Sequence, residues 1–187
     1  TADLNTAKKL ILNAKTRRVS ICNALDVLLL NQKIYKKVLA SLVDDLSVRN
    51  VEIRADKPSY QILKKLNYPK LKQSSIKDFD TEFLDYCLAV KVVGNFNQAI
   101  DHIKKHSLGH SEAIITRTRK HAQEFFRKID AACLYLNTST QFSDGGEFGL
   151  GGEIGISTQK LHARGPFAFA ELTTHKYLVE SHGLGRG

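Results

Sequence analysis

The chain has 187 residues, 42% hydrophobic and 25% charged, which suffices for one domain with a sizeable buried core. No apolar run approaches the roughly 20 residues of a membrane helix, and no charged-then-apolar leader predicts secretion. The formal net charge of +9 is compatible with binding of nucleic acid, with binding of an anionic substrate, or with a solvated basic surface. The Lys and Arg residues are dispersed along the chain, and no aromatic-basic motif typical of nucleic-acid binding accompanies them.

Helical spacing and short apolar runs alternate along the first three quarters of the chain. Apolar periodicity predicts helices over residues 3–15, 34–46, 59–66, 95–106 and 120–129. Compact apolar runs predict strands at residues 25–30, 51–54, 88–93, 113–116 and 133–136. Residues 67–80 are polar and predict a loop. This alternation indicates an α/β fold with a mostly parallel sheet flanked by helices.

The carboxyl-terminal quarter has a different composition. Residues 139–165 are rich in Gly, Ser and Thr, and residues 172–180 predict one more strand. A glycine-rich stretch of this length is either disordered or lines a functional site. Residues 149–152 lack the strand before and the helix after that a phosphate-binding loop requires.

Cys22 is framed by small, polar and basic residues. Because nearby cations lower a thiol pKa, Lys15, Arg17 and Arg18 are candidates for increasing the thiolate fraction. If they do so, Cys22 is expected to act as a nucleophile that attacks an acyl carbon. The alternative is that Cys22 is a buried structural thiol.

The other two cysteines, Cys87 and Cys133, lie within predicted strands and are expected in the core. Three cysteines far apart in sequence favour a reducing compartment, hence the cytoplasm.

Two segments resemble γ-glutamyl phosphate reductase (glutamate-5-semialdehyde dehydrogenase), a branch of the aldehyde dehydrogenase superfamily. They are residues 13–24, with Val19-Ser20-Ile21-Cys22-Asn23-Ala24, and residues 137–166, with His162-Ala163-Arg164-Gly165-Pro166. The resemblance runs over nearly the whole chain. It implies an aldehyde-dehydrogenase-like catalytic domain over 1–165 and a carboxyl-terminal oligomerisation strand and tail over 166–187. The chain contains no Met and begins at Thr1, and the amino-terminal NADPH-binding domain is expected to be largely absent from it.

The resemblance also implies an activity. The family reduces L-glutamyl 5-phosphate to glutamate-5-semialdehyde with NADPH and releases phosphate, in proline biosynthesis. A cysteine thiolate displaces phosphate to form a thioester, and hydride then yields the aldehyde. The implied partners are the small-molecule substrate, further copies of the chain and glutamate 5-kinase, with no nucleic acid and no membrane.

Site residues follow from the matching motifs. Cys22 matches the nucleophile, and Asn13 either shapes the oxyanion region or ends a helix. Glu82 resembles the glutamate that contacts the nicotinamide ribose, or is a solvated acid. Phe148 and Gly149 resemble the Phe-Gly pair near the nicotinamide.

The substrate loop is expected to contain Ser139, Thr140 and Asp144. The family has an arginine where this chain has Gln141, and glutamine cannot replace a charged clamp for an anion. Arg164 is either a phosphate or carboxylate ligand, or part of a structural salt bridge.

No metal site is predicted. His102, His106 and His110 have helical spacing, but Gly109 is expected to end their helix, and no cysteine or carboxylate cluster completes a ligand set. Two rival functions stay open. One is a non-catalytic fragment that self-associates through its last strand, and the other is a basic nucleic-acid-binding module.

Overall fold

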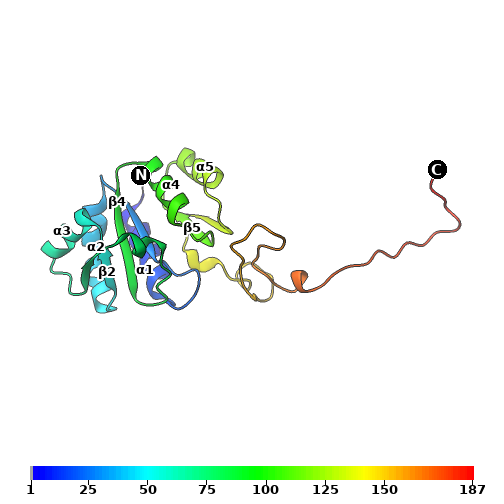
Figure 1. Cartoon of the computed structure of the whole chain (residues 1–187), viewed down its shortest axis with the longest axis horizontal. Helices are drawn as coiled ribbons and strands as arrows, with labels where there is room; N and C mark the ends of the chain where they lie inside the picture. The colour runs from blue at the N-terminus through cyan, green and yellow to red at the C-terminus, as the bar shows by residue number, and fades with distance from the viewer. Residues whose placement is uncertain (1) are drawn as a thin grey trace.

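The computed structural model describes residues 2–187 as a folded body from which the carboxyl-terminal segment projects (Figure 1). The helices are α1 (Leu4–Thr16), α2 (Tyr35–Val48), α3 (Lys57–Lys65), α4 (Phe96–His106) and α5 (Arg119–Lys128), with 3-10 helices η1 (Ile76–Asp80), η2 (Thr140–Phe142) and η3 (Ala170–Leu172). The strands are β1 (Val27–Asn31), β2 (Glu52–Ala55), β3 (Leu71–Gln73), β4 (Cys87–Val93), β5 (Ser111–Ile114) and β6 (Cys133–Leu136).

All strand pairs are parallel, as predicted, but the strands form two sheets. The larger sheet has the order β1-β4-β2-β3, and β5 pairs only with β6. One edge of β1 and one edge of β5 therefore have no strand neighbour among residues 2–187. The predicted α/β fold with parallel strands and flanking helices is otherwise confirmed.

Side-chain caps fix where three helices begin. Asp3, Asp56 and Asn95 each accept a hydrogen bond from the backbone N–H three residues on, at 2.9, 3.1 and 3.0 Å respectively. An acceptor in this position satisfies an N–H group that has no partner within the helix. These caps explain why the predicted and observed amino-terminal ends of α1, α3 and α4 nearly coincide.

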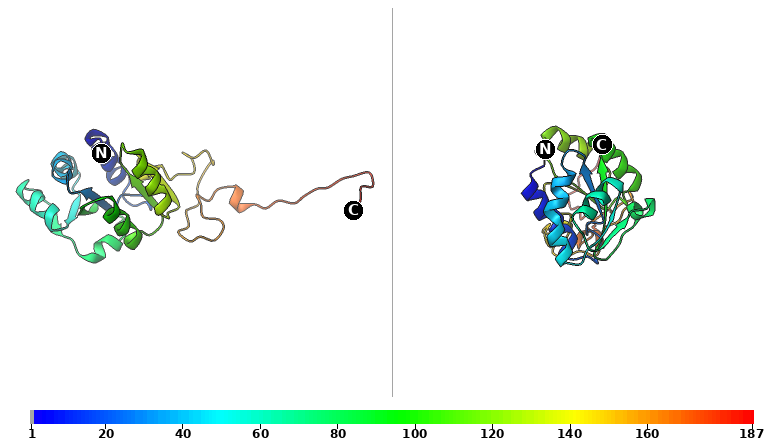
Figure 2. Two further views of the ribbon diagram at one scale, coloured as in Figure 1. Left: turned by 90° about the horizontal axis from the view of Figure 1, so that it is seen from above. Right: turned by 90° about the vertical axis from the view of Figure 1, so that its left-hand side faces the viewer.

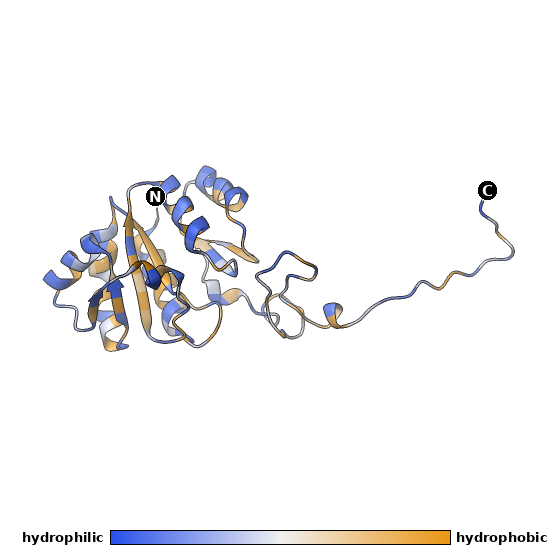
Figure 3. Ribbon diagram, in the orientation of Figure 1, coloured by the Kyte–Doolittle hydropathy of each residue, from blue (hydrophilic) through white to orange (hydrophobic). Residues whose placement is uncertain are grey.

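Figure 3 shows β4 coloured mainly hydrophobic, whereas the visible surfaces of α3, α4 and α5 are largely hydrophilic. In the main core, α2 packs Leu39, Leu42 and Leu46 against the sheet, and all three are at most 1% exposed. A smaller core joins α4 and α5 through Ile100 and Phe125. The second core supports the β5–β6 pair, and β5 lines one wall of the cleft described below.

Two regions differ from the prediction. The predicted loop at 67–80 contains β3 and η1. β3 is a short edge strand that forms because its residues pair in parallel with β2. η1 begins with a capping box between Ser75 and Asp78. The strand predicted at 172–180 is not formed: residues 173–180 are extended and exposed (Figure 2), because within residues 2–187 they pair with no sheet edge.

Residues 2–187 contain no helix that is both long enough and apolar enough to cross a membrane.

Candidate functional site

Cys22 lies on the connection between α1 and β1 and is exposed to solvent. The residue after it holds the connection in place. Asn23 is 5% exposed, and its Nδ2 donates to the carbonyl of Ser143 at 2.9 Å, while the Thr140 hydroxyl donates to the carbonyl of Asn23 at 2.6 Å. The accessible thiol therefore sits on a segment clamped to the turn that follows β6.

Gln141 provides a second clamp on the same segment. Its side chain is buried, and Nε2 donates to the carbonyls of Ala14 and Arg18 at 3.0 and 2.9 Å. The amide thus bridges the end of α1 to the segment before Cys22. The Gln141 side chain is therefore engaged with backbone carbonyls, which a neutral amide satisfies, and its effect on substrate binding stays a prediction.

A cleft of about 500 Å³ opens between β1 and β5 and extends to Cys22. Its walls are mainly apolar. Its polar lining includes Cys22, Glu82, His110, Ser139 and Thr140, so the structure brings together four of the residues expected from the motifs. His110, which was considered from the sequence only as a metal ligand, also lines the cleft.

The charges around Cys22 are opposite to those expected. Although Cys22 is exposed as a residue, partial burial of its sulfur raises the thiol pKa, and the carboxylates of Glu153 and Glu82 raise it further, against two backbone hydrogen bonds that lower it. The groups that shift the pKa of this thiol most do not include Lys15, Arg17 or Arg18, so activation of Cys22 by these cations has no support here. Arg17 and Arg18 are exposed to solvent, so water screens their charge.

Lys15 is directed into the protein rather than towards the thiol. It is fully buried, its ammonium has no hydrogen-bond partner among residues 2–187, and its nearest carboxylate oxygen, on Asp26, is 3.5 Å away. Burial lowers the pKa of Lys15 and raises that of Asp26. Asp26 in turn accepts a hydrogen bond from the backbone N–H of Phe83 at 3.3 Å, which anchors the segment that carries Glu82.

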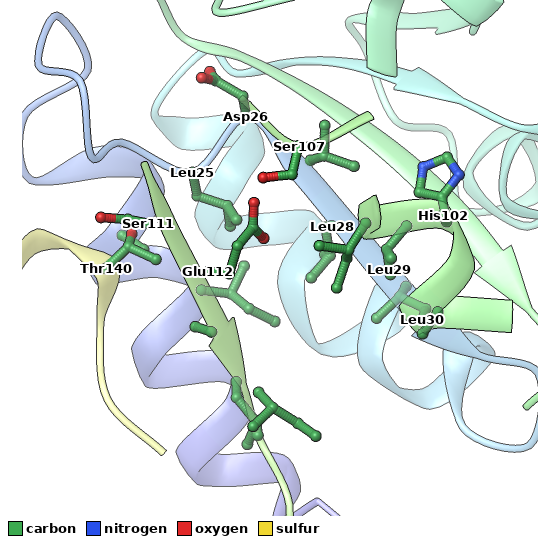
Figure 4. A pocket seen from close by; sticks show the side chains of 18 of the residues that line it. Leu25, Asp26, Leu28, Leu29, Leu30, His102, Ser107, Ser111, Glu112 and Thr140 are labelled. Atoms are coloured by element: carbon green, nitrogen blue, oxygen red, sulfur yellow. The ribbon is translucent and has the colours of Figure 1, made fainter. Parts of the chain in front are cut away.

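Glu112 is a second carboxylate that the sequence did not single out. Figure 4 shows its side chain reaching from β5 into the cleft towards Leu25 and Leu28, with Ser107 beside it. Burial among these apolar groups raises the pKa of Glu112 to about 7. The carboxyl group therefore changes its charge near neutral pH.

Several predicted site residues lie outside the cleft lining. Asn13 is exposed on α1, and Asp144 caps a turn by accepting from the backbone N–H of Gly146 at 2.8 Å. Phe148 and Gly149 lie on the exposed part of the glycine-rich segment. Their assigned roles stay predictions.

Arg164 pairs with Asp130, with Nη1 2.9 Å from Oδ1, and Lys160 contacts the same carboxylate. This geometry favours the structural alternative for Arg164. The pair anchors the glycine-rich segment to the end of α5.

Metal ligation has no support in the described part of the chain. Residues 2–187 contain no group of three His, Cys, Asp or Glu side chains placed to hold a metal ion. α4 ends at His106, so His110 lies beyond the helix, and His106 Nδ1 contacts Asp80 at 2.6 Å.

No family model matches the chain. Curated proteins do. A gamma-glutamyl phosphate reductase from Thermoanaerobacter sp. is 49% identical over all 187 residues, and one from Legionella pneumophila is 52% identical over 183 residues. The chain covers 43% of each of these relatives.

Solved structures agree. The gamma-glutamyl phosphate reductase of Thermotoga maritima matches the whole chain with a TM-score of 0.88 and 44% identity, over 44% of its own length. A putative methylmalonate-semialdehyde dehydrogenase from Sinorhizobium meliloti, complexed with NAD, matches 74% of the chain and 37% of its own length with a TM-score of 0.57 and 17% identity. The second match supports the fold alone.

Proposed function

Because this chain is homologous to gamma-glutamyl phosphate reductases along its whole length, we propose that it forms the thiol-bearing portion of such an enzyme. The reaction is the NADPH-dependent reduction of L-glutamyl 5-phosphate to glutamate-5-semialdehyde with release of phosphate. One observation carries this proposal: Cys22 is exposed at a polar-lined end of the cleft, on a segment held by buried hydrogen bonds.

Each residue of the cleft has a separate role in the proposed reaction. Cys22 Sγ attacks the acyl carbon, phosphate departs, and a thioester forms. The hydroxyl and backbone groups near Ser139 and Thr140 line the cleft where the substrate would lie.

A nicotinamide cofactor would supply the hydride. Glu82 fits one part of such a cofactor, because it is exposed, lines the cleft and offers two oxygens to ribose hydroxyls. The exposed ring of Phe148 and the backbone of Gly149 offer apolar and close-approach surfaces on the glycine-rich segment. We assign NADPH, rather than NADH, from the family resemblance.

The test is phosphate-dependent reduction of NADP⁺ with glutamate-5-semialdehyde, by protein carrying this chain. Activity that is lost in Cys22→Ala and kept in Cys133→Ala supports the proposal. Activity that survives Cys22→Ala contradicts the assignment of the nucleophile. Three free thiols also fit a reducing compartment, and we place the protein in the cytoplasm.

A second function, self-association, is favoured by the exposed tail. Tyr177, Leu178 and Val179 are 80% or more exposed in an extended segment, so another copy with a free sheet edge would bury them. Light scattering after chromatography tests this. We expect an oligomer that Leu178→Lys weakens and Lys176→Arg does not, and a monomeric wild-type chain would contradict it.

A further inference from the structure

The cleft runs along two strand edges that have no strand neighbour. β1 pairs only with β4, and β5 pairs only with β6, so within residues 2–187 one edge of each strand is left open. Every residue of β1 and every residue of β5 lines the cleft. The cleft is therefore a gap between two open sheet edges, rather than a pocket in a closed surface.

The two facing strands run in the same direction. The Ser111 hydroxyl, at the start of β5, contacts the Ser143 hydroxyl at 2.8 Å, and the carbonyl of Ser143 accepts from Asn23 Nδ2 at 2.9 Å. Asn23 comes shortly before β1, so the amino ends of both strands lie at the same end of the cleft. A third strand in this direction would be parallel to both, like every other strand pair of the chain.

The backbone of β1 presents hydrogen-bonding groups to the gap. The carbonyl of Asp26 accepts from β4 at 2.8 Å, and the N–H of Gln32 donates to β4 at 2.9 Å. Alternate residues of a strand direct their backbone groups to opposite sides. The even-numbered residues of β1 thus face β4, whereas Val27 and Leu29 face the gap, where they have no strand partner among residues 2–187.

The backbone of β5 presents a matching row from the other side. The carbonyls of His110 and Ile114 accept from N–H groups of the β6 segment, both at 2.9 Å. The alternation then directs the backbone groups of Ser111 and Ala113 to the gap. Because backbone groups inside proteins are almost always paired, the occupant has to satisfy both rows at once. An extended strand does this, since it carries N–H and C=O groups along both edges.

Apolar side chains from two helices cover the gap as they would cover a strand. The cleft lining contributed by α1 comprises Ala7, Leu10, Ile11 and Ala14, and that contributed by α4 comprises Phe96, Ala99, Ile100 and Ile103. Parallel strands packed between helices are apolar along their whole length. The gap offers such a strand an apolar space of about 500 Å³ with backbone partners on both sides.

The titratable side chains of the cleft leave most of the space between the two strands free. Four of them precede a strand and so lie at the amino ends of the parallel strands: Cys22, Asp26, Glu82 and His110. Four others belong to η1, α4 or α5: Asp80, His102, His106 and His121. Only Glu112 belongs to one of the facing strands, and its side chain reaches towards Leu28 on the other (Figure 4). A strand in the gap therefore needs a small or polar residue only where it passes Glu112.

α1 shows where such a strand would be connected. The first turn of α1 lies at the carboxyl end of β5, because Asp3 Oδ2 accepts from Arg117 Nη2 at 2.6 Å, and Ala2 lines the cleft. The last turn lies at the amino end of β1, because the N–H of Leu25 donates to the carbonyl of Ala14 at 3.0 Å. A helix that leads from the carboxyl end of one strand position to the start of the neighbouring strand is the crossover of a βαβ unit.

We propose that the cleft holds one further parallel strand, formed by the segment that precedes residue 1 in the whole protein, and that this strand joins the two sheets into one. The inference rests on the proposed function only in taking the chain as one portion of a longer protein; the chain covers 43% of its relatives. We expect the strand to have about five residues, like β1. They should form a continuous apolar run, apart from the position beside Glu112.

Two other occupants fit the gap less well. A small apolar ligand would cover the walls but leave both rows of backbone groups without partners. The extended tail of a second copy, residues 173–180, has the outer edges of β3 and β6 open to it. That tail also lacks the covalent connection to α1, which gives the preceding segment a high effective concentration at the cleft.

Hydrogen exchange of single amides, measured by NMR, tests the proposal. We compare this chain with a version extended at its amino end by the roughly ten residues that precede it in the whole protein. Because the amides of Leu29 and Ala113 face the gap, the extension should slow their exchange by about tenfold or more. The amide of Gln73, on the outer edge of β3, should exchange at the same rate in both proteins. An extension of the same residues in scrambled order should protect neither Leu29 nor Ala113.

A matched pair of variants in the whole protein gives a second measurement, which decides the matter if this chain does not fold alone. Leu29→Pro removes a donor that faces the gap, and Gln73→Pro removes one on the outer edge of β3. We expect Leu29→Pro to speed exchange of the Ala113 amide by about tenfold or more, because the strand between them is released. Gln73→Pro should leave that amide unchanged.

Three results would overturn the proposal. The first is equal exchange at Leu29 and Ala113 with and without the extension, together with an unchanged Ala113 amide in Leu29→Pro. The second is equal protection by the scrambled extension. The third is protection that this chain already shows and loses on dilution, which would assign the gap to the tail of a second copy. None of these measurements uses substrate or cofactor, so a failed strand leaves the proposed reaction standing, and a lack of Cys22-dependent activity leaves the strand in place.

Discussion

The carboxyl group of Glu112 should make the stability of this chain fall as the pH rises through neutrality. Burial raises its pKa from 4.5 to about 7, so the folded state holds a proton that the unfolded state releases. The stabilising contribution is complete below the unfolded value of 4.5 and is lost as the pH rises through 7. The full difference corresponds to about 3 kcal/mol, of which about 2 kcal/mol lies between about pH 5.5 and 8.5.

Urea unfolding at several pH values in this range measures the effect directly. The wild-type chain should lose about 2 kcal/mol of unfolding free energy relative to Glu112→Gln, whose neutral amide does not titrate. Glu180→Gln serves as the control, because Glu180 is exposed on the carboxyl-terminal tail. Parallel pH profiles for the wild type and Glu112→Gln would refute the argument that the apolar cleft wall sets this pKa.

Three further outcomes are expected, each checked by urea unfolding. Gln141→Leu should cost about 2–4 kcal/mol, because two buried carbonyls lose their donor; a cost below that of a surface substitution would contradict the clamp. Lys15→Met should lower the free energy of unfolding by about 3–5 kcal/mol, because Asp26 loses its cationic partner. The double variant Lys15→Met with Asp26→Leu should recover most of this loss, and additive losses would show that the two charges do not interact. Leu42→Ala should cost about 2–5 kcal/mol, since Leu42 is 0% exposed in the main core; a smaller cost would mean that the core collapses around the cavity.

The sequence was sufficient for elements with strong local signals. Helices with a side-chain cap and an apolar stripe, and the buried strand β4, were placed within one or two residues because each is specified by neighbouring residues. β3 was missed because its polar residues pair only when β2 presents an edge. The strand predicted at 172–180 is not formed, because an extended segment becomes a strand only when it pairs with a partner strand.

The candidate site also combines features that neighbouring residues indicate with features that depend on the fold. The motifs pointed to Cys22, Glu82, Ser139 and Thr140, and all four line one cleft, while the role of Cys22 as nucleophile stays a prediction. The local sequence could not reveal that Lys15 points into the core, because proximity along the chain does not fix the direction of a side chain.

The contacts of His110 and Gln141 could not be predicted from neighbouring residues. Their contacts join residues more than 30 and more than 120 positions apart, through Ser111 to Ser143 and through Gln141 to Ala14. Only the fold brings such residues together.

The most direct test of the central claim is to trap the acyl group on the thiol. Protein carrying this chain, mixed with L-glutamyl 5-phosphate and no hydride donor, should release one phosphate per chain and gain one glutamyl group on the peptide that contains Cys22. Cys22→Ser should show neither within the same time. A glutamyl group on another residue, or phosphate release that survives Cys22→Ser, would contradict the account.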